Sequence, residues 1–467
     1  MLVVIAVVCL GLALDFVGFT RLPSCSGSST ATASITKSQL QFVQFGPVRK
    51  YKLPSGRSPN AIAVERDGSV WFGEQALPGI AHFFANGTLV EYTWPFQYKS
   101  PVGFTYIWGI ADWDGCVWAT DQAGSQLVAV DPNTGRVNTI KLTPGSFPYT
   151  ITIGPDNSLW FTEIFESKLA RVDDHFNLHE YPMPDLGTPG QVVFANDTLG
   201  YYVDTGNAGI SEPGIYSFDP SDFSPILIDR SVTQLIIPTS LALSNNGIWM
   251  AQHETSELAY YRIGGHSLVQ FPTTPISYTK ATLPYFVVGN GSLVWFNEHY
   301  ANRIGVIDTQ RQLLTEYSLS NPPANKTTQI DNALTFALGG NRVWFTELTA
   351  DYVGYIDATY KPSFCFQSVN ETMKLASGKK GTIALVLQGE SERNLTVVSA
   401  DSETLTGAPE SIVLSSNETQ IHPFQGQEGV TLTVSTSAIT APGQYELLLS
   451  VTDGLVCQGV YVSLVVQ

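Results

Sequence analysis

The sequence predicts an all-β fold, in which a seven-bladed β-propeller closed by an N-terminal strand is followed by a C-terminal immunoglobulin-like β-sandwich. Three observations lead to this prediction. A short aromatic strand motif recurs every 41–49 residues, a spacing typical of propeller blades. The last repeat lacks a strand, whereas an unmatched strand precedes the first repeat. Beyond residue 360 the tryptophans end, and short Val/Leu/Thr strands alternate with polar turns.

The repeated motif is an apolar residue, an aromatic residue, two apolar or small residues and an acid. Its clear copies are VWFGE (70–74), VWATD (117–121), LWFTE (159–163), VWFNE (294–298) and VWFTE (343–347), and the degenerate copies are GYYVD (200–204) and IWMAQ (248–252). In the first repeat, residues 60–66, 69–74, 79–85 and 88–94 read as four strands. Asp67-Gly68 and Asn86-Gly87 supply tight hairpin turns between them.

The seventh repeat predicts how the ring closes. Its third strand, YVGYID (352–357), leads directly into the next domain without a fourth strand. The segment VRKYKLP (48–54) precedes the first repeat and has no partner there. We expect the two segments to pair, because an N-terminal strand that completes the last blade leaves no sheet edge exposed. An open stack of repeats would need no displaced strand, so the propeller is expected over residues 46–360.

Residues 361–467 are expected to form the sandwich. The turn that precedes the alternating strand in APGQYELLLSVTD (441–453) is typical of such modules. Cys365 lies near the first strand of this domain and Cys457 in its last strand. We expect a disulfide between them in an oxidising compartment, and two separate buried thiols are the alternative.

The N-terminus predicts export. Residues 1–24 contain an apolar run and are expected to be a signal peptide or signal-anchor, and residues 25–45 a Ser/Thr-rich stalk. The chain is expected to be secreted or anchored at the cell surface. Seven N-glycosylation acceptor patterns support this location, at Asn86, Asn196, Asn290, Asn325, Asn370, Asn394 and Asn417.

The charge balance limits the partners. The chain has 24 Lys and Arg against 41 Asp and Glu, which gives a formal charge of −17. Such an excess of negative charge argues against nucleic acid and against an anionic membrane surface as the main partner. Membrane contact is therefore expected only through the N-terminal segment.

The aligned second strands predict a ring of acids at one mouth of a central channel. The residues at these strand ends are Glu74, Asp121, Glu163, Asp204, Gln252, Glu298 and Glu347. Crowded carboxylates raise one another's pKa and attract cations such as Mg²⁺ or Ca²⁺. The alternative is structural, with each acid accepting hydrogen bonds from the turn of its own blade.

Symmetry breaks in the fifth and sixth repeats, where the strand ends read Gln252-His253-Glu254 and Glu298-His299. His253, His299, Glu298 and Glu254 are therefore the candidate catalytic residues, as a base beside carboxylates or as metal ligands. Tyr149 and Tyr285 begin inner strands nearby and are expected at the same mouth. The alternative is a pair of exposed loop histidines.

The order VWFTE, IGxID and EYxLP resembles the virginiamycin B lyase (streptogramin lyase) family of seven-bladed propellers, over about residues 46–360. The resemblance implies a Mg-dependent lyase that opens a cyclic depsipeptide ester by elimination. It also implies a His after the Pro that begins an inner strand. This chain has instead Pro59-Asn60, Pro148-Tyr149, Pro189-Gly190, Pro238-Thr239 and Pro284-Tyr285.

Three functions are open from the sequence. The first is a propeller that binds a small molecule, a peptide, or a surface protein or glycan at one channel mouth, with or without a divalent cation. The second is a streptogramin lyase-like C–O lyase, and the third is a structural protein of the cell envelope. Whether the chain is an enzyme is undecided at this stage.

Overall fold

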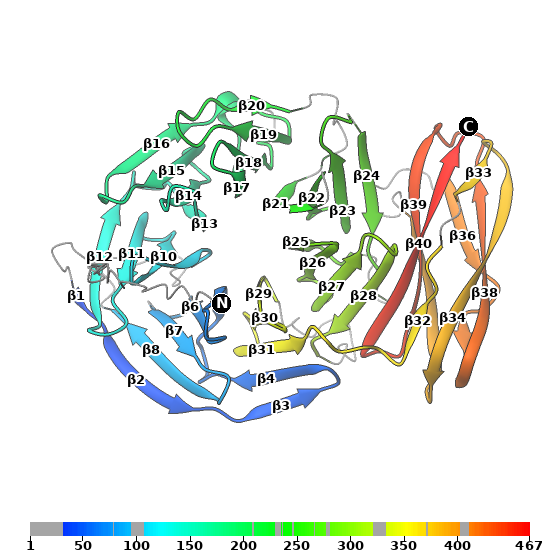
Figure 1. Cartoon of the computed structure of the whole chain (residues 1–467), viewed down its shortest axis with the longest axis horizontal. Helices are drawn as coiled ribbons and strands as arrows, with labels where there is room; N and C mark the ends of the chain where they lie inside the picture. Colours follow the sequence, from blue (N-terminus) through cyan, green and yellow to red (C-terminus); the bar gives the residue numbers. More distant parts are fainter. Residues whose placement is uncertain are drawn as a thin grey trace, which may run out of the picture.

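The computed structural model describes residues 31–467 except 78, 95–106, 208–209, 229–234, 236, 245–246, 266, 277–280, 321–332, 370–371 and 402–410. Apart from one 3₁₀ turn, η1 (Pro184–Leu186), the regular structure of this part of the chain consists of β-strands. Each repeat forms an antiparallel sheet, and these sheets surround a common centre (Figure 1). The arrangement is propeller-like, and the prediction of an all-β fold is confirmed.

Within each sheet the strands follow chain order from the centre outward. The first two sheets contain β5 (Pro59–Val64), β6 (Val70–Glu74), β7 (Gly79–Phe83) and β8 (Thr88–Thr93), then β9 (Ile110–Trp113), β10 (Cys116–Asp121), β11 (Gln126–Val130) and β12 (Arg136–Lys141). The next two contain β13 (Pro148–Ile153), β14 (Leu159–Glu163), β15 (Lys168–Val172) and β16 (Leu178–Pro182), then β17 (Pro189–Asn196), β18 (Leu199–Asp204), β19 (Gly214–Phe218) and β20 (Ile226–Leu227).

The fifth to seventh repeats continue the pattern. Their strands are β21 (Pro238–Ser244), β22 (Gly247–Gln252), β23 (Glu257–Arg262) and β24 (Ser267–Pro272), then β25 (Pro284–Asn290), β26 (Leu293–Glu298), β27 (Arg303–Asp308) and β28 (Leu313–Ser318), then β29 (Thr335–Gly339), β30 (Arg342–Glu347) and β31 (Tyr352–Asp357). As predicted, the seventh repeat supplies only three strands.

The aromatic residue of the motif packs the sheets together. Trp160 and Trp344 are fully buried, and the other motif tryptophans are 3 % exposed. Trp344 of the last repeat contacts Phe83 of the first, with ring centroids 6.0 Å apart, so the two ends of the repeat array are neighbours. A large side chain at this position buries apolar surface between adjacent sheets, which explains why the repeat retains it.

The inner strands that begin with proline, β5, β13, β17, β21 and β25, have a β-bulge or register irregularity near their start. In β13 the register shifts between Pro148 and Ile151, and in β25 it shifts between Pro284 and Val287. Proline is tolerated at the first position of a strand because its missing N–H is not needed there. A bulge bends the strand and changes the direction of nearby side chains. The residues after these prolines, Tyr149 and Tyr285, come from this distorted backbone.

The N-terminal strand β4 (Val48–Lys52) pairs with β31 of the last repeat, with Tyr352 opposite Lys52 and Ile356 opposite Val48. This pairing agrees with the prediction for VRKYKLP and YVGYID. A buried ion pair reinforces it, because Lys50 Nζ lies 2.9 Å from a carboxylate oxygen of Glu347. The Asp351 carboxylate also accepts backbone N–H bonds from residues 56–58, so it joins the last repeat to the segment before the first.

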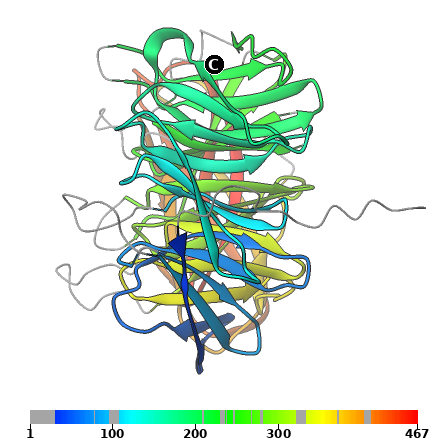
Figure 2. The same ribbon diagram turned by 90° about the vertical axis from the view of Figure 1, so that its left-hand side faces the viewer.

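The expected stalk over residues 25–45 is wrong for residues 31–45, which form β1 (Ala31–Thr32), β2 (Ser34–Gln39) and β3 (Phe42–Phe45). These strands add to the outer edges of β12, β8 and β4, and β1 and β2 lie on the side away from the C-terminal sheets (Figure 2). The end of β3 instead reaches the C-terminal part, because Phe45 packs in one cluster with Leu455. Ser and Thr suit this role, because an outer strand exposes one face to water while its backbone satisfies an open sheet edge. Composition alone could not distinguish this strand ribbon from a flexible linker.

The C-terminal residues form two sheets around a shared hydrophobic core. One contains β32 (Phe364–Phe366), β34 (Lys380–Ser391), β36 (Ile412–Ser416) and β38 (Phe424–Thr436), and the other β33 (Met373–Leu375), β35 (Leu395–Asp401), β37 (Gln420–Ile421), β39 (Gly443–Thr452) and β40 (Val456–Val466). Strand β40 also pairs with β28, from Leu313 opposite Val460 to Tyr317 opposite Val456. The C-terminal part is thus joined to the sixth repeat by a continuous sheet rather than by a flexible spacer.

The predicted disulfide between Cys365 and Cys457 is wrong, because both thiols are free. Cys365 lies on β32 and accepts a weak hydrogen bond from Gln388, within its own sheet. Cys457 is buried on β40 of the other sheet, 3.4 Å from the Thr274 hydroxyl in the propeller-like part. The two sulfurs therefore face different neighbours.

The expected leader, residues 1–24, lies outside the described residues, and none of the helical segments described is long and apolar enough to cross a bilayer.

Candidate functional site

The candidate site lies where inner strands begin and second strands end. Antiparallel pairing brings these two ends together, as in Pro284 opposite Glu298 and Pro238 opposite Gln252. We call the side of the ring formed by these strand ends the histidine face, because His253 and His299 each follow a second strand there. The backbone N–H groups of His253 and His299 bond to the carbonyls of residues 237 and 283, which fixes both residues beside inner strands.

The structure brings the two predicted histidines into contact. Their Nε2 atoms are 2.8 Å apart, and their rings stack with centroids 5.0 Å apart and planes 8° from parallel. His253 Nδ1 lies 2.9 Å from a carboxylate oxygen of Glu254. Three of the four predicted catalytic residues therefore form one hydrogen-bonded chain, Glu254–His253–His299, which we call the histidine relay.

The protons of the relay follow from its partners. A carboxylate can only accept, so Nδ1 of His253 carries the proton given to Glu254. When His253 accepts at Nε2, His299 donates from its own Nε2 and its Nδ1 is an acceptor. This Nδ1 is buried, and no described residue hydrogen-bonds to it. Burial, and then the nearby His253, lower the pKa of His299 to about 4, so its ring is neutral at physiological pH.

Two tyrosines form the aromatic wall beside the relay. Tyr149 donates a 2.8 Å hydrogen bond to the Tyr285 hydroxyl. The Tyr285 ring meets the edges of both imidazoles, with centroids 5.4 and 5.8 Å away. Burial raises the pKa of Tyr285 to about 12 and also raises the pKa of Tyr149, so both phenols stay protonated at neutral pH. The structure thus places Tyr285 against both histidines and Tyr149 against Tyr285.

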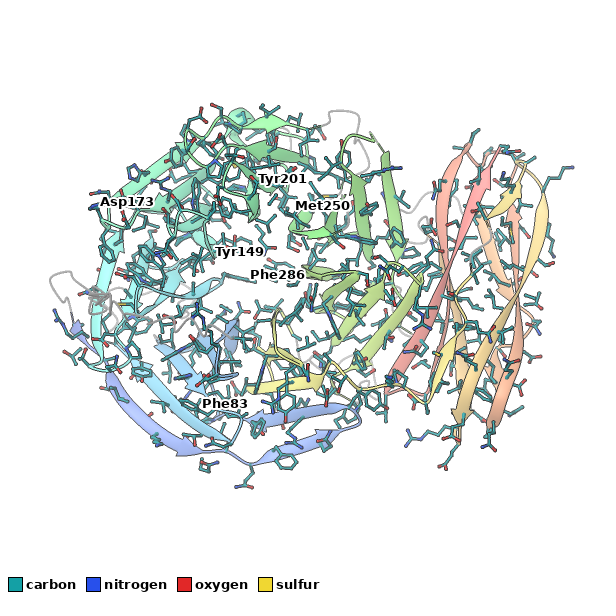
Figure 3. The ribbon with its side chains drawn as sticks, in the orientation of Figure 1. Phe83, Tyr149, Asp173, Tyr201, Met250 and Phe286 are labelled. Atoms are coloured by element: carbon teal, nitrogen blue, oxygen red, sulfur yellow. The ribbon has the colours of Figure 1, made fainter. Side chains whose placement is uncertain are left out.

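Trp108 and Phe286 complete this wall and were not predicted. The Trp108 ring lies 5.4 Å from Tyr149 and 5.6 Å from Tyr285, and Phe286 lies 5.2 Å from Tyr285. Figure 3 shows Tyr149 and Phe286 pointing into the middle of the ring. Trp108 lies just before the inner strand β9, and Phe286 lies near the start of the inner strand β25. Aromatic residues at strand starts were therefore a signal that could have identified them.

A central cavity of about 120 Å³ lies next to the aromatic wall. Trp108 and Phe286 line it, together with inner-strand residues such as Thr150, Gln191 and Phe336. An apolar cavity of about 150 Å³ can hold benzene. The cavity therefore has the size for one small ring or branched aliphatic group, next to a hydrogen-bonding relay.

The acids at the strand ends do not form an open ring. All six are buried, with at most 1 % of their surface exposed. Asp121 accepts bonds from Gly124 and Gln126, and Asp204 from Thr188 and Gly206, all within the same repeat. Their placement fits the structural alternative, in which each acid serves its own repeat.

Three of these acids are held beside carboxylates of the fourth strands. Burial, and then Glu180, raise the pKa of Glu163 to about 7. Burial, and then Glu316, raise the pKa of Glu298 to about 8, whereas Arg303 opposes the shift. Burial, and then Glu91, raise the pKa of Glu74. Glu298 is thus buried beside Glu316 and Arg303 of its own sheet, whereas His299 follows the end of β26 and contacts His253.

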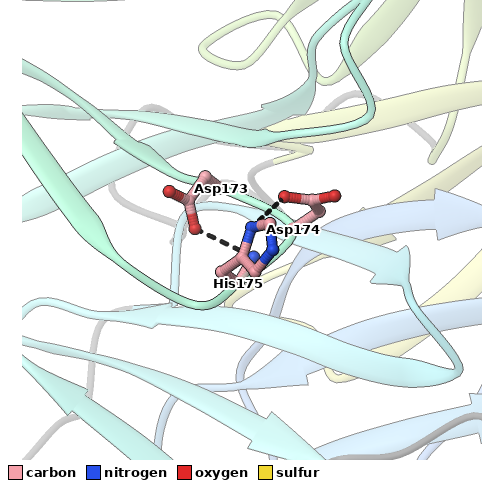
Figure 4. Close-up of side chains that lie close together, drawn as sticks. All are labelled: Asp173, Asp174 and His175. Atoms are coloured by element: carbon pink, nitrogen blue, oxygen red, sulfur yellow. Dashed lines mark hydrogen bonds and ion pairs between the residues drawn. The ribbon is translucent and has the colours of Figure 1, made fainter.

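The residues present do not fit Mg²⁺ or Ca²⁺ at the histidine face. These cations prefer several oxygen ligands, and the relay offers one carboxylate and two imidazoles. The described residues contain one group of three converging ligands, Asp173, Asp174 and His175, on an exposed hairpin between β15 and β16 (Figure 4). The Asp173 carboxylate there accepts backbone bonds from residues 175 and 177, which is the role of a turn residue.

Comparisons with known proteins support the propeller-like fold of the repeat region. Residues 31–212 match the model of the virginiamycin B lyase family. The propeller resembles that family, as the repeat predicted. The chain is 28 % identical over 145 residues to the virginiamycin B lyase of Nocardia farcinica (strain IFM 10152), a match that covers 31 % of this chain and 48 % of that protein. The aligned region thus spans about half the length of that relative.

Solved structures show the same fold. The crystal structure of virginiamycin B lyase from Staphylococcus aureus aligns with a TM-score of 0.55 and 20 % identity, over 70 % of this chain and 99 % of that one. A catalytically inactive variant of that enzyme with quinupristin, in which one histidine is replaced by alanine, aligns with a TM-score of 0.54 at 20 % identity, over 69 % of this chain and 99 % of that one. At these identities the likeness concerns the fold.

Proposed function

We propose that this chain is an extracytoplasmic, closed seven-bladed propeller that binds a small organic ligand at its histidine face, with an immunoglobulin-like sandwich fixed to its sixth blade. The observation that carries the proposal is the histidine relay, which ends in a buried nitrogen, Nδ1 of His299, to which no described residue hydrogen-bonds. A buried polar atom without a hydrogen bond costs about 1–3 kcal/mol. A ligand N–H or O–H group that reached this atom would remove that cost.

The surroundings of the relay favour a ligand with both polar and apolar parts. The aromatic wall supplies flat apolar surface, and the 120 Å³ cavity next to it accepts one ring-sized group. Binding pockets commonly combine an apolar lining with a few polar groups that fix orientation. A peptide-like molecule with an amide N–H and an aromatic side chain fits this description, and the structure of a relative with quinupristin makes that compound a reasonable probe.

The extracytoplasmic location is supported by the sequons. Asn86, Asn196, Asn290, Asn394 and Asn417 are all exposed, so glycan attachment would disturb no core packing. Asn325 and Asn370 lie outside the described residues. The location is tested by fractionation of the native host and by the mass of the purified chain before and after enzymatic deglycosylation.

A second function, elimination of an ester, is favoured by the carboxylate–imidazole pair in the relay. Such a pair orients a base. A relay base would take a proton from the carbon next to the ester-bearing carbon, the C–O bond would break, and the carboxylate would leave. No step here uses a metal, because the donor set does not suit Mg²⁺. The low pKa of His299 weakens it as a base, and binding is therefore the primary proposal.

One titration separates the two functions. The full chain is incubated with quinupristin, binding is followed by calorimetry, and the compound is recovered for chromatography and mass spectrometry. Unchanged compound with saturable binding supports the binding function. A ring-opened isomer of equal mass would replace it with the lyase function, since elimination adds no water. No binding and no turnover would contradict both for this ligand class.

Variants tie the result to the relay. His299→Phe removes the buried acceptor but keeps an aromatic ring, and Tyr285→Phe removes one hydroxyl. We expect His299→Phe to weaken binding at least about tenfold, because a hydrogen bond to a buried group is worth about 1–3 kcal/mol. The exposed His175→Gln on the third repeat is the matched control and should bind normally. Equal affinity of His299→Phe and wild type would refute the assignment of the site.

A further inference from the structure

A second cavity, of about 1060 Å³, opens on the opposite face of the ring. Its lining comes from the ends of the inner strands β5, β9 and β13, and includes Glu65, Asp112 and Ile153. In β13, Pro148 pairs with Glu163 at the histidine face, whereas Ile153 pairs with Leu159 at the far end of the same two strands. The cavity and the histidine relay therefore lie at opposite ends of the sheets, and the cavity has no part in the function proposed above.

Two carboxyl groups from different repeats meet in this cavity. Glu65 follows β5 and Asp112 lies in β9, and both residues line the cavity. Burial, then Asp112 and Asp67, raise the pKa of Glu65 to about 7, and burial also raises the pKa of Asp112. Like charges held near each other in this way favour a bound cation.

A hydroxyl, a histidine and an aspartate line the same cavity, but their order does not suit a nucleophile. The Ser69 hydroxyl donates to Asp67 and contacts Nε2 of His82 at 2.7 Å. The serine proton therefore faces the carboxylate, and the histidine must donate to the serine oxygen. Burial lowers the pKa of His82 to about 4, and its ring stacks on Trp71 with centroids 4.1 Å apart. The group is a polar wall that adds no positive charge at neutral pH.

We propose that this cavity binds an organic cation, whose ammonium or guanidinium group lies against the carboxyl groups of Glu65 and Asp112. The volume is that of a site for an organic molecule rather than for a single ion, since typical ligand pockets measure about 300–1,000 Å³. A metal ion is the weaker occupant, because only two carboxylates converge and no third ligand joins them within the described residues.

The charges around the pair agree with this ligand class. Asp67 adds a third carboxylate, and hydrogen bonds from Ser69 lower its pKa, so it stays ionised. Arg66 is the one Lys or Arg side chain in the lining, and it lowers the pKa of Asp112. Three carboxyl groups against one guanidinium leave a negative cavity once Glu65 is ionised. A bound cation would restore the balance.

The test uses the full chain, with 1,6-diaminohexane as the probe and its neutral isostere 1,6-hexanediol as the matched control. Calorimetry in two buffers of different ionisation enthalpy measures affinity and proton release. We expect the diamine alone to bind, with a proton released below pH 7 and with affinity falling as the pH falls, because protons compete for the carboxyl pair. We expect Glu65→Gln and Asp112→Asn to weaken binding at least about tenfold, whereas Asp174→Asn, on an exposed hairpin, should leave it unchanged.

The outcomes divide cleanly. Equal binding of the diol would show that the cavity does not recognise charge and would overturn the proposal. Binding of Ca²⁺ that depends on Glu65, without binding of the diamine, would replace the organic cation by a metal. No binding of either probe, or equal affinity of Glu65→Gln and wild type, would also overturn it. Glu65→Gln keeps the side-chain volume and relieves like-charge contact, and circular dichroism checks that the variant is folded.

Discussion

The contact between Lys50 and Glu347 gives the sharpest prediction about this fold. The N-terminal strand β4 is attached to the last repeat by backbone bonds to β31 and by this ion pair. Lys50 is 7 % exposed and Glu347 is fully buried, and Lys50 Nζ lies 2.9 and 3.2 Å from the two carboxylate oxygens. Lys50→Met retains most of the aliphatic stem and removes the charge. The carboxylate of Glu347 would then remain buried without its cation.

The expected loss of stability follows from the burial of this ion pair. Removing one partner of a buried ion pair costs about 3–5 kcal/mol. Glu347 keeps a 2.9 Å hydrogen bond from Asn302, so we expect a loss near the lower end, about 3 kcal/mol. Lys52 lies on the same strand but is exposed, and among the described residues its ammonium group contacts the Tyr352 ring and a backbone carbonyl. Lys52→Met is the matched control and should cost less than about 1 kcal/mol.

Urea unfolding followed by tryptophan fluorescence measures the effect, because the buried Trp344 lies in the strand that carries Glu347. The double variant Lys50→Met/Glu347→Gln should recover part of the stability, since the amide carries no buried charge. Equal unfolding midpoints for Lys50→Met and Lys52→Met would refute the reasoning. That result would mean that the ion pair contributes nothing to the attachment of β4 to the last repeat.

Three further predictions concern the rest of the chain. Deletion of residues 361–467 exposes the edge of β28, which β40 covers. The truncated chain should therefore aggregate in size-exclusion experiments or lose stability in unfolding experiments. A stable monomer would contradict a structural role for the pairing of β28 with β40. In denatured, unreduced protein a thiol-reactive reagent should label both Cys365 and Cys457. In the native protein Cys457 should react slowly, because burial raises its pKa. If neither cysteine were labelled after denaturation, the two would be joined in a disulfide. The pKa of His299 is about 4 in the folded chain and about 6.5 when unfolded, so the unfolded state binds more protons between these pH values. The free energy of unfolding should therefore fall by up to about 3 kcal/mol as the pH drops from 6.5 to 4. His299→Gln should lose this contribution, so its free energy of unfolding should depend less on pH over this range than that of wild type.

The repeat motif was the strongest guide to the fold because it records a local requirement. Every sheet needs one large aromatic residue to pack against its neighbour, and Trp71, Trp160 and Trp344 all fill that role. The missing strand of the last repeat likewise predicted a partner, and β4 pairs there. The strands in residues 31–45 were not predicted, because a strand at the outer edge of a sheet buries little apolar surface. Its sequence then shows only a polar composition that strands tolerate.

The acids show where local patterns mislead. Glu74, Glu163 and Glu347 share a sequence position, and position alone does not say whether a side chain faces a channel or the interior of a sheet. The disulfide failed for a similar reason, because Cys365 and Cys457 have compatible spacing but lie on different sheets with different neighbours. Sequence distance contains no information about the direction of a side chain.

Hydrophobic periodicity and a repeated aromatic anchor, both local properties, were enough to specify strands, their order and the end at which His253, His299, Tyr149 and Tyr285 would gather. Only the tertiary structure decided how those residues meet: that the two imidazoles bond to each other, that one ring nitrogen is left as a buried acceptor, and that Glu298 turns into its own sheet. It also brought Glu65 and Asp112 together from two repeats on the opposite face. Contacts between residues far apart in the chain depend on how whole sheets pack, and no short stretch of sequence contains that geometry.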